Sequence, residues 1–138
     1  MSHIYLAAPL FSLAEQNFNF ELAEYLRQEG FTVFLPQAEC SGKVDRDIYT
    51  TCLGGLASAV LVVAVLDGAD ADSGTCWECG YAVAKGIPVI GVRSDFRGSG
   101  DIRGFNAMLY HSASAIVEGS EHLFPRLVQA IRELQSLN

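Results

Sequence analysis

The chain has 138 residues, the length of one average domain, so separate cofactor-binding and substrate-binding lobes are not expected. Half of the residues are hydrophobic and 18% are charged, which excludes a mainly disordered chain. Sixteen Asp and Glu outnumber nine Lys and Arg, for a net charge of −7, and no basic stripe is present. Nucleic acid is therefore not an expected partner.

The N-terminal apolar run is unlike a signal peptide, because no Lys or Arg precedes it and Pro9 interrupts it. No apolar stretch reaches the roughly 18 residues that a membrane helix needs. We therefore expect a soluble, cytoplasmic protein with no membrane partner.

Four cysteines, at positions 40, 52, 76 and 79, are few for a chain that can build its own core, and we expect them to be reduced thiols. Cys76 and Cys79 have the spacing of redox and zinc motifs. There is no second such pair, however, and the three histidines are scattered. Neither a metal site nor a disulfide is predicted from this spacing.

Short apolar runs alternate with helical patterns along the chain. The helical pattern runs from Ala14 to Tyr25, ending before Gly30, and again from Leu123 to Leu137. This alternation predicts one α/β domain over residues 1–138, with a parallel sheet of about five strands covered by helices. Functional residues should then lie at the carboxyl ends of the strands. The predicted strands are residues 4–8, 31–35, 59–66, 87–92 and 113–117.

The polar stretch from Arg93 to Gly104 is predicted to be a loop, with a solvated loop, a lid and a subunit contact as alternatives. No Gly-x-Gly-x-x-Gly follows the first strand, and no phosphate-binding loop ending in Gly-Lys-Ser/Thr occurs. Dinucleotide-dependent dehydrogenases and kinases are therefore disfavoured.

Three carboxylates, Asp67, Asp72 and Glu78, cluster between the third strand and the next helix. One interpretation is structural: Thr75 to Glu78 fits a capping box, and Asp72 or Ser73 could also cap the helix. The other is catalytic, since a carboxylate in the first turn of a helix is a plausible nucleophile toward an electrophilic carbon, with Asp72 as the acid.

Paired carboxylates suit glycosidic bond cleavage, where one stabilises the anomeric carbon and the other handles the proton of the leaving group. Tyr5, near the end of the first strand, could donate a hydrogen bond to the nucleophile, or it could be an ordinary core residue.

The segments IYLAAPLF at 4–11, DGADADSGTCWECGYAVAKGIPVIGV at 67–92 and Asn106-Ala107-Met108 together resemble the nucleoside 2-deoxyribosyltransferases. The middle segment is the specific one: a strand ending in Asp-Gly, then Asp-Ser-Gly-Thr, then Glu-x-Gly-Tyr-Ala. Order and spacing match over most of the chain. The resemblance implies a flavodoxin-like fold with helices on both faces of the sheet and a homo-oligomer with shared active sites. It also implies exchange of nucleobases on 2-deoxyribose through a covalent glutamyl sugar, without a cofactor.

The resemblance also implies roles for individual residues. Glu78 would be the nucleophile, Tyr5 the phenol that orients it and Asp72 the carboxyl that handles base protonation, whereas Asp67 would only order its loop. The expected substrate-binding positions are Ala7, Phe11 and Gln37 beside the first two strands, Cys52, and Asn106 and Met108, which would reach into a neighbouring subunit's site.

Cys52 stands where this family usually carries an Asp, four residues before Leu56. A thiol supplies neither the charge nor the paired acceptor oxygens of a carboxylate, so base recognition or leaving-group protonation is expected to differ. Asp45 or Asp47 could supply the carboxylate that is missing at position 52, or both could be ordinary solvated charges near a helix start.

Three functional hypotheses follow. The first is a transferase that exchanges bases on 2′-deoxyribonucleosides with retention. The second is a nucleoside or nucleotide hydrolase in which water captures the same glutamyl intermediate. The third is a non-catalytic nucleotide-binding module in which Glu78 only supports its helix. Base preference and the number of subunits are left open by the sequence.

Overall fold

The computed structural model describes residues 2–98 and 100–137 as a single domain with a five-stranded sheet. The predicted α/β class is confirmed. The elements are β1 His3–Ala7, α1 Leu13–Gln28, β2 Val33–Phe34, α2 Pro36–Glu39, α3 Asp45–Ala57, β3 Ala59–Val65, α4 Ser73–Ala84, β4 Val89–Arg93, α5 Ala107–Ser112, β5 Ala115–Glu118 and α6 Leu123–Ser136.

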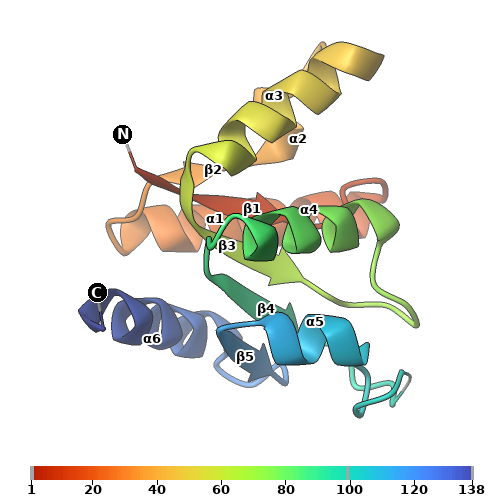
Figure 1. Cartoon of the computed structure of the whole chain (residues 1–138), viewed down its shortest axis with the longest axis vertical. Coiled ribbons are helices and arrows are strands. Elements are labelled where there is room, and N and C mark those ends of the chain that lie inside the picture. The colour runs from red at the N-terminus through yellow and green to blue at the C-terminus, as the bar shows by residue number, and fades with distance from the viewer. Residues whose placement is uncertain (1, 99, 138) are drawn as a thin grey trace.

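All strand pairs are parallel, in the order β2-β1-β3-β4-β5 (Figure 1). The chain builds outward from β1 to β2 and then crosses back to place β3 on the other side of β1. The strand order therefore reverses between β1 and β3. In open α/β sheets, ligands bind where such a reversal opens a crevice at the carboxyl ends of the strands.

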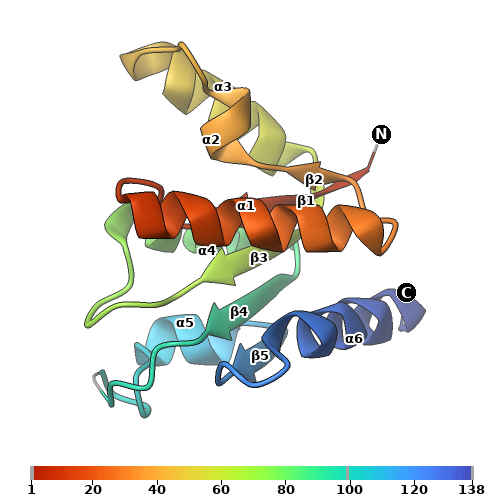
Figure 2. The same cartoon turned by 180° about the vertical axis from the view of Figure 1, so that it is seen from behind.

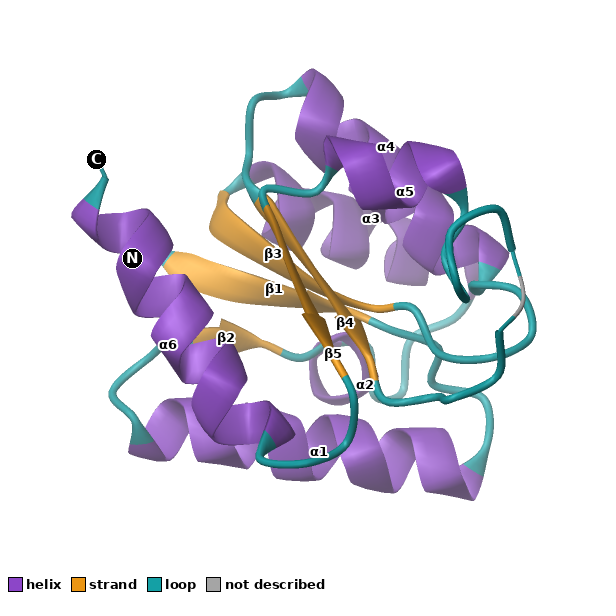
Figure 3. Cartoon of the chain, turned by 90° about the horizontal axis from the view of Figure 1, so that it is seen from below, coloured by secondary structure: helices purple, strands orange, loops and turns teal. Residues whose placement is uncertain are grey.

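Helices cover both faces of the sheet, as Figure 3 shows. Helices α1 and α6 pack on one face, seen from the front in Figure 2, and α3, α4 and α5 lie on the other. Among residues 2–98 and 100–137, no helix combines the length and the apolar character needed to cross a bilayer.

The alternation of side chains along β1 divides the core in two. Ile4 and Leu6 join the core under α1 and α6, whereas Tyr5 and Ala7 join the core under α3 and α4. Tyr5 is therefore fixed by the register of β1 on the face that carries α4 and its Glu78. A one-residue slip of β1 would move Tyr5 to the opposite face.

The segment after β4 differs from a purely solvated loop. Arg93, predicted as its first residue, is the last residue of β4 and is buried, with Nη1 donating to the carbonyls of Leu66 at 2.7 Å and Gly68 at 3.0 Å. Asp67 accepts hydrogen bonds from Ser94 N at 2.7 Å and Ser94 Oγ at 2.6 Å. These contacts tie the segment to the end of β3, and Asp67 orders its loop as expected. Ser99 lies outside the described residues.

One predicted strand is much shorter in the structure, and one helix was missed, each for a local reason. Only Val33 and Phe34 of the predicted 31–35 strand pair with β1, because Pro36 starts α2 two residues later. Helix α5, too short to show a helical period, was not predicted.

Candidate active site

A cavity of about 650 Å³ lies between α3 and α4, over the end of β1 that carries Tyr5. We call it the Glu78 cavity. It brings together Tyr5, Cys52 and Glu78, three candidate residues that are far apart in the sequence. Its lining residues are Tyr5, Tyr49, Cys52, Leu53, Leu56, Ser73, Gly74, Trp77 and Glu78.

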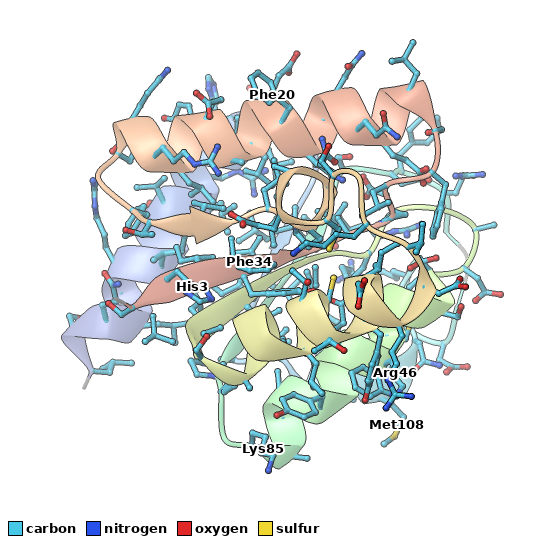
Figure 4. All side chains as sticks on the ribbon, turned by 90° about the horizontal axis from the view of Figure 1, so that it is seen from above. His3, Phe20, Phe34, Arg46, Lys85 and Met108 are labelled. Carbon is cyan, nitrogen blue, oxygen red and sulfur yellow. The ribbon has the colours of Figure 1, made fainter. Side chains whose placement is uncertain are left out.

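Gly55 lets α3 lie close to the sheet at this point. A Cβ at Gly55 would come within 2.5 Å of the Phe34 ring, so only glycine permits the packing. Phe34 stacks on the ring of Tyr5, with centroids 5.2 Å apart, and on the ring of His3, with centroids 5.5 Å apart. Figure 4 shows His3 and Phe34 side by side. His3 Nε2 in turn donates to the Gly55 carbonyl at 2.7 Å. The Tyr5 ring is thus held rigidly, and its hydroxyl faces the cavity.

Helix α4 starts at Asp72, which is its N-cap: Asp72 Oδ2 accepts from Thr75 N at 2.9 Å and from Thr75 Oγ1 at 3.0 Å. The capping box predicted from Thr75 to Glu78 is wrong, because the helix begins three residues earlier. The alternative, a cap by Asp72, is confirmed. With this start, Gly74, Trp77 and Glu78 fall on one face of α4 and line the cavity.

The pKa of Glu78 is raised to about 7. Burial is the largest cause, the Tyr5 hydroxyl opposes it, and the nearby Asp72 charge adds to it. Burial, followed by the Glu78 charge, raises the pKa of Tyr5 well above its usual 10. Near neutral pH, Glu78 can therefore exchange a proton while Tyr5 stays a hydrogen-bond donor.

Two buried polar atoms of this cavity, Tyr5 Oη and Glu78 Oε2, have no hydrogen-bond partner among the described residues. The Tyr5 hydroxyl is near enough to affect the pKa of Glu78 but does not form a hydrogen bond of good geometry with it. Unpaired buried polar groups are costly and rare in folded proteins. Their concentration here is typical of a site that is built for a ligand rather than for stability.

Cys52 lines the cavity and also packs against the core under α3 and α4, and its thiol lies near Tyr5 and Glu78. Asp45 and Asp47 are exposed in the first turn of α3 and are not among the lining residues, so no carboxylate of α3 replaces the missing one.

We expect Cys52→Asp to change the ranking of nucleobase acceptors and to shift the acid limb of the rate profile to higher pH. The new carboxylate would face Glu78, and like charges raise each other's pKa. The measurement is kcat/KM against pH for a panel of bases, with the melting temperature of the same variant and Cys52→Ser as the matched control. A large loss of stability with an unchanged acceptor ranking would contradict this role for Cys52.

Three of the expected substrate-binding residues lie outside the Glu78 cavity. Ala7 is fully buried in the core, and Phe11 is exposed in the turn before α1. Gln37 links α2 to α1 by accepting from Asn19 Nδ2 at 3.2 Å and donating to the Gln16 carbonyl at 2.9 Å. The structure does not bring these side chains together with Glu78.

Asn106 and Met108 line a second cavity of about 530 Å³ between α4 and α5, which we call the Asn106 cavity. Cys76, Cys79 and Val83 line it from the face of α4 opposite to Glu78. Asn106 caps α5 by accepting from Met108 N at 2.9 Å, and Met108 is 78% exposed. Within one chain, these two residues therefore cannot reach the site of their own Glu78.

Two aromatic residues of the Glu78 cavity, Tyr49 and Trp77, were not singled out from the sequence. They are about half exposed, and their rings meet edge to face with centroids 6.3 Å apart. The position of Trp77 directly before Glu78 was the one sequence signal that could have pointed to Trp77. Residues 2–98 and 100–137 contain no cluster of His, Cys, Asp and Glu that could hold a metal ion.

The model of the family described as nucleoside 2-deoxyribosyltransferase matches residues 4–123, which include Tyr5, Cys52, Asp72 and Glu78. The chain belongs to the nucleoside 2-deoxyribosyltransferase family. A sequence comparison with curated proteins finds no match.

Solved structures with the same fold include members of this family. A conserved protein from Enterococcus faecalis is 29% identical, with a TM-score of 0.75 over 94% of this chain and 99% of that one. A 2-deoxyribosyltransferase from Bacillus psychrosaccharolyticus is 27% identical, with a TM-score of 0.69 over 84% and 85%. The CMP N-glycosidase of Clostridium botulinum, 18% identical with a TM-score of 0.64 over 94% and 98%, shares the fold.

Proposed function

We propose that this protein exchanges the nucleobase of 2′-deoxyribonucleosides through a covalent glutamyl-deoxyribose intermediate. The observation that supports this most directly is the pair of unpaired, buried oxygens, Glu78 Oε2 and Tyr5 Oη, in one cavity. A carboxylate that no protein group satisfies is available to an electrophilic carbon of the substrate.

In this mechanism, ionised Glu78 attacks C1′ of the deoxyribose from the face opposite to the base. The C1′–N bond breaks, and its electron pair stays on the base nitrogen. We assign the proton delivered there to Asp72, which does not itself line the cavity but caps α4 next to Ser73 and Gly74, which do. A second base then attacks C1′, gives its N–H proton to Asp72 and displaces Glu78, so two inversions give retention. The Tyr5 phenol holds the carboxylate in place by donating a hydrogen bond as the substrate enters.

The charge of the cavity supports nucleosides over nucleotides as substrates. None of the described residues that line it is Lys or Arg, so nothing there complements a 5′-phosphate. Tyr49 and Trp77 at its mouth offer aromatic faces on which a base can stack.

The test is to incubate the protein with 2′-deoxyinosine and free adenine and to separate the products. Formation of 2′-deoxyadenosine establishes the transferase. Free deoxyribose without new nucleoside establishes the hydrolase, and no consumption of any nucleoside establishes a binding module. Trp77 is the sole tryptophan of the chain, so quenching of its fluorescence by adenine reports base binding independently of turnover.

We expect kcat/KM to rise with pH and to reach half its plateau near pH 7, because Glu78 must be ionised to attack and its pKa is raised to about 7. At pH 6 the value should be about tenfold below the plateau. Tyr5→Phe should move this limb to higher pH, because the Tyr5 hydroxyl lowers the pKa of Glu78. Tyr25→Phe, on the other side of the sheet, is the control. If Tyr5→Phe leaves the midpoint of the kcat/KM profile at the same pH, the rise of kcat/KM with pH is not due to Glu78.

A further inference from the structure

Two thiols meet at the wall of the Glu78 cavity. Cys40 Sγ and Cys52 Sγ are 3.4 Å apart, and both cysteines are free and partly exposed. Cys40 is the C-cap of the short helix α2, and Cys52 lies in the middle of α3. Cys52 lines the cavity, whereas Cys40 is not among the lining residues.

We propose that Cys40 and Cys52 are a modification site, which a peroxide converts to a reversible disulfide that lowers the activity of the adjoining cavity. The effect on activity rests on the proposed function, but the formation of the disulfide does not.

The local structure allows the bond to form. A disulfide needs its sulfurs at about 2.05 Å, so the two atoms must approach from 3.4 Å. Of residues 41–51, which join the two cysteines, 41–50 are exposed and only Thr51 is half-buried, and α2 has only four residues. This connection is therefore free of the close packing that would resist a small shift.

The chemistry balances with one peroxide per disulfide. The Cys40 thiolate attacks a peroxide oxygen, the O–O bond breaks, and a sulfenic acid forms as hydroxide leaves and is protonated to water. The Cys52 sulfur then attacks the sulfenic sulfur, the S–S bond forms, and a second water leaves with the thiol proton. Two thiols thus lose two electrons and two protons to the peroxide. Burial, followed by the hydrogen bond with Cys40, raises the pKa of Cys52 to about 11, so Cys52 is mostly a neutral thiol at neutral pH and is assigned the second step.

Oxidation changes the cavity in two ways. It removes the thiol proton of Cys52 beside Tyr5, and it joins α3 to the end of α2. Because α3 carries Tyr49, Cys52 and Leu53 of the cavity wall, its position sets the width of the opening above Glu78.

The other two cysteines do not form such a pair. Cys79 is buried, and the Cys76 thiol points to the Ala71 carbonyl at 3.8 Å. No contact between the sulfurs of Cys76 and Cys79 occurs among the described residues, although their spacing resembles a redox motif.

The experiment treats the full chain with hydrogen peroxide and follows intact mass, disulfide-linked peptides, Trp77 fluorescence and kcat/KM for base exchange. We expect a loss of about 2 Da, a peptide linking Cys40 to Cys52, a changed Trp77 emission and an approximately tenfold fall in kcat/KM. Dithiothreitol should restore all four. Cys40→Ser, which keeps the cavity thiol, should retain the reduced protein's activity and lose the response.

A missing Cys40–Cys52 peptide would overturn the proposal. So would a disulfide that leaves both Trp77 emission and kcat/KM unchanged, or an equal response in Cys40→Ser. If the reduced protein shows no base exchange, the proposed function fails. The linked peptide and the Trp77 emission then still decide whether the thiol pair modifies the cavity.

Discussion

Glu78→Gln is expected to lower base exchange by about 10³-fold or more, because an amide cannot form the glutamyl intermediate and no other carboxylate lines the cavity among the described residues. The measurement is the initial rate of 2′-deoxyadenosine formation from 2′-deoxyinosine and adenine. Glu21→Gln, which removes an exposed carboxylate from α1, is the matched control and should keep the wild-type rate. Retention of more than a few per cent of the rate by Glu78→Gln would rule out the covalent role.

The same substitution should stabilise the protein above neutral pH. The pKa of Glu78 is raised to about 7 in the folded state, above its ordinary value near 4.5. The contribution of protonated Glu78 to the free energy of unfolding is thus fully present below about pH 4.5 and is lost as the pH rises through 7. The loss is on the order of 3 kcal/mol, and Gln, which does not ionise, avoids it. Melting curves should therefore separate at pH 8 and coincide near pH 4. Equal melting temperatures at pH 8 would contradict the raised pKa.

We propose that Asn106 completes the site of a neighbouring subunit in a homo-oligomer, so mixed oligomers of two inactive variants are expected to regain activity. Asn106 lies on the opposite side of α4 from Glu78, so it can serve a Glu78 site only in a neighbouring subunit. Glu78→Gln supplies intact Asn106, and Asn106→Asp supplies intact Glu78 while keeping an oxygen that caps α5. At equal amounts, about one quarter of the sites should combine both intact residues, since each is present with a probability of about one half.

Re-assembly of each variant with itself is the control and should stay inactive. Activity is measured after co-expression, with mass spectrometry to verify that the oligomers are mixed. No recovery in verified mixed oligomers would exclude a site that the two subunits share.

The fold was predictable because its signals are local. Runs such as residues 59–66 are apolar at successive positions and so on both faces of a strand. This pattern is typical of a strand that is buried between two layers of helices. For Tyr5 the sequence left two roles open, and the register of β1 in the structure places it on the face that carries α4. The start of α4 was less certain, since Asp72, Ser73 and Thr75 are all good caps, and only the path of the chain after β3 decides among them.

The contact between Cys40 and Cys52 could not be predicted. It depends on how residues 41–44 turn between α2 and α3, and that turn has no sequence pattern as clear as a strand or a long helix. The sequence instead drew attention to Cys76 and Cys79, whose spacing is familiar. The aromatic pair of Tyr49 and Trp77 was missed for the same reason, because its members come from two helices whose relative position is set by Gly55 and Phe34.

The exposure of residues 41–50 has a consequence for cooperativity. The inner end of α3 is anchored by Leu56 in the core, whereas its outer turns bury no side chain among the described residues. Amide hydrogens in those turns are therefore expected to exchange through local opening, at a much lower free energy than those of β1 and β3. The α3 wall of the Glu78 cavity is thus expected to open at a lower free energy than the strand that carries Tyr5, so that substrate binding can be followed as slowed exchange in α3.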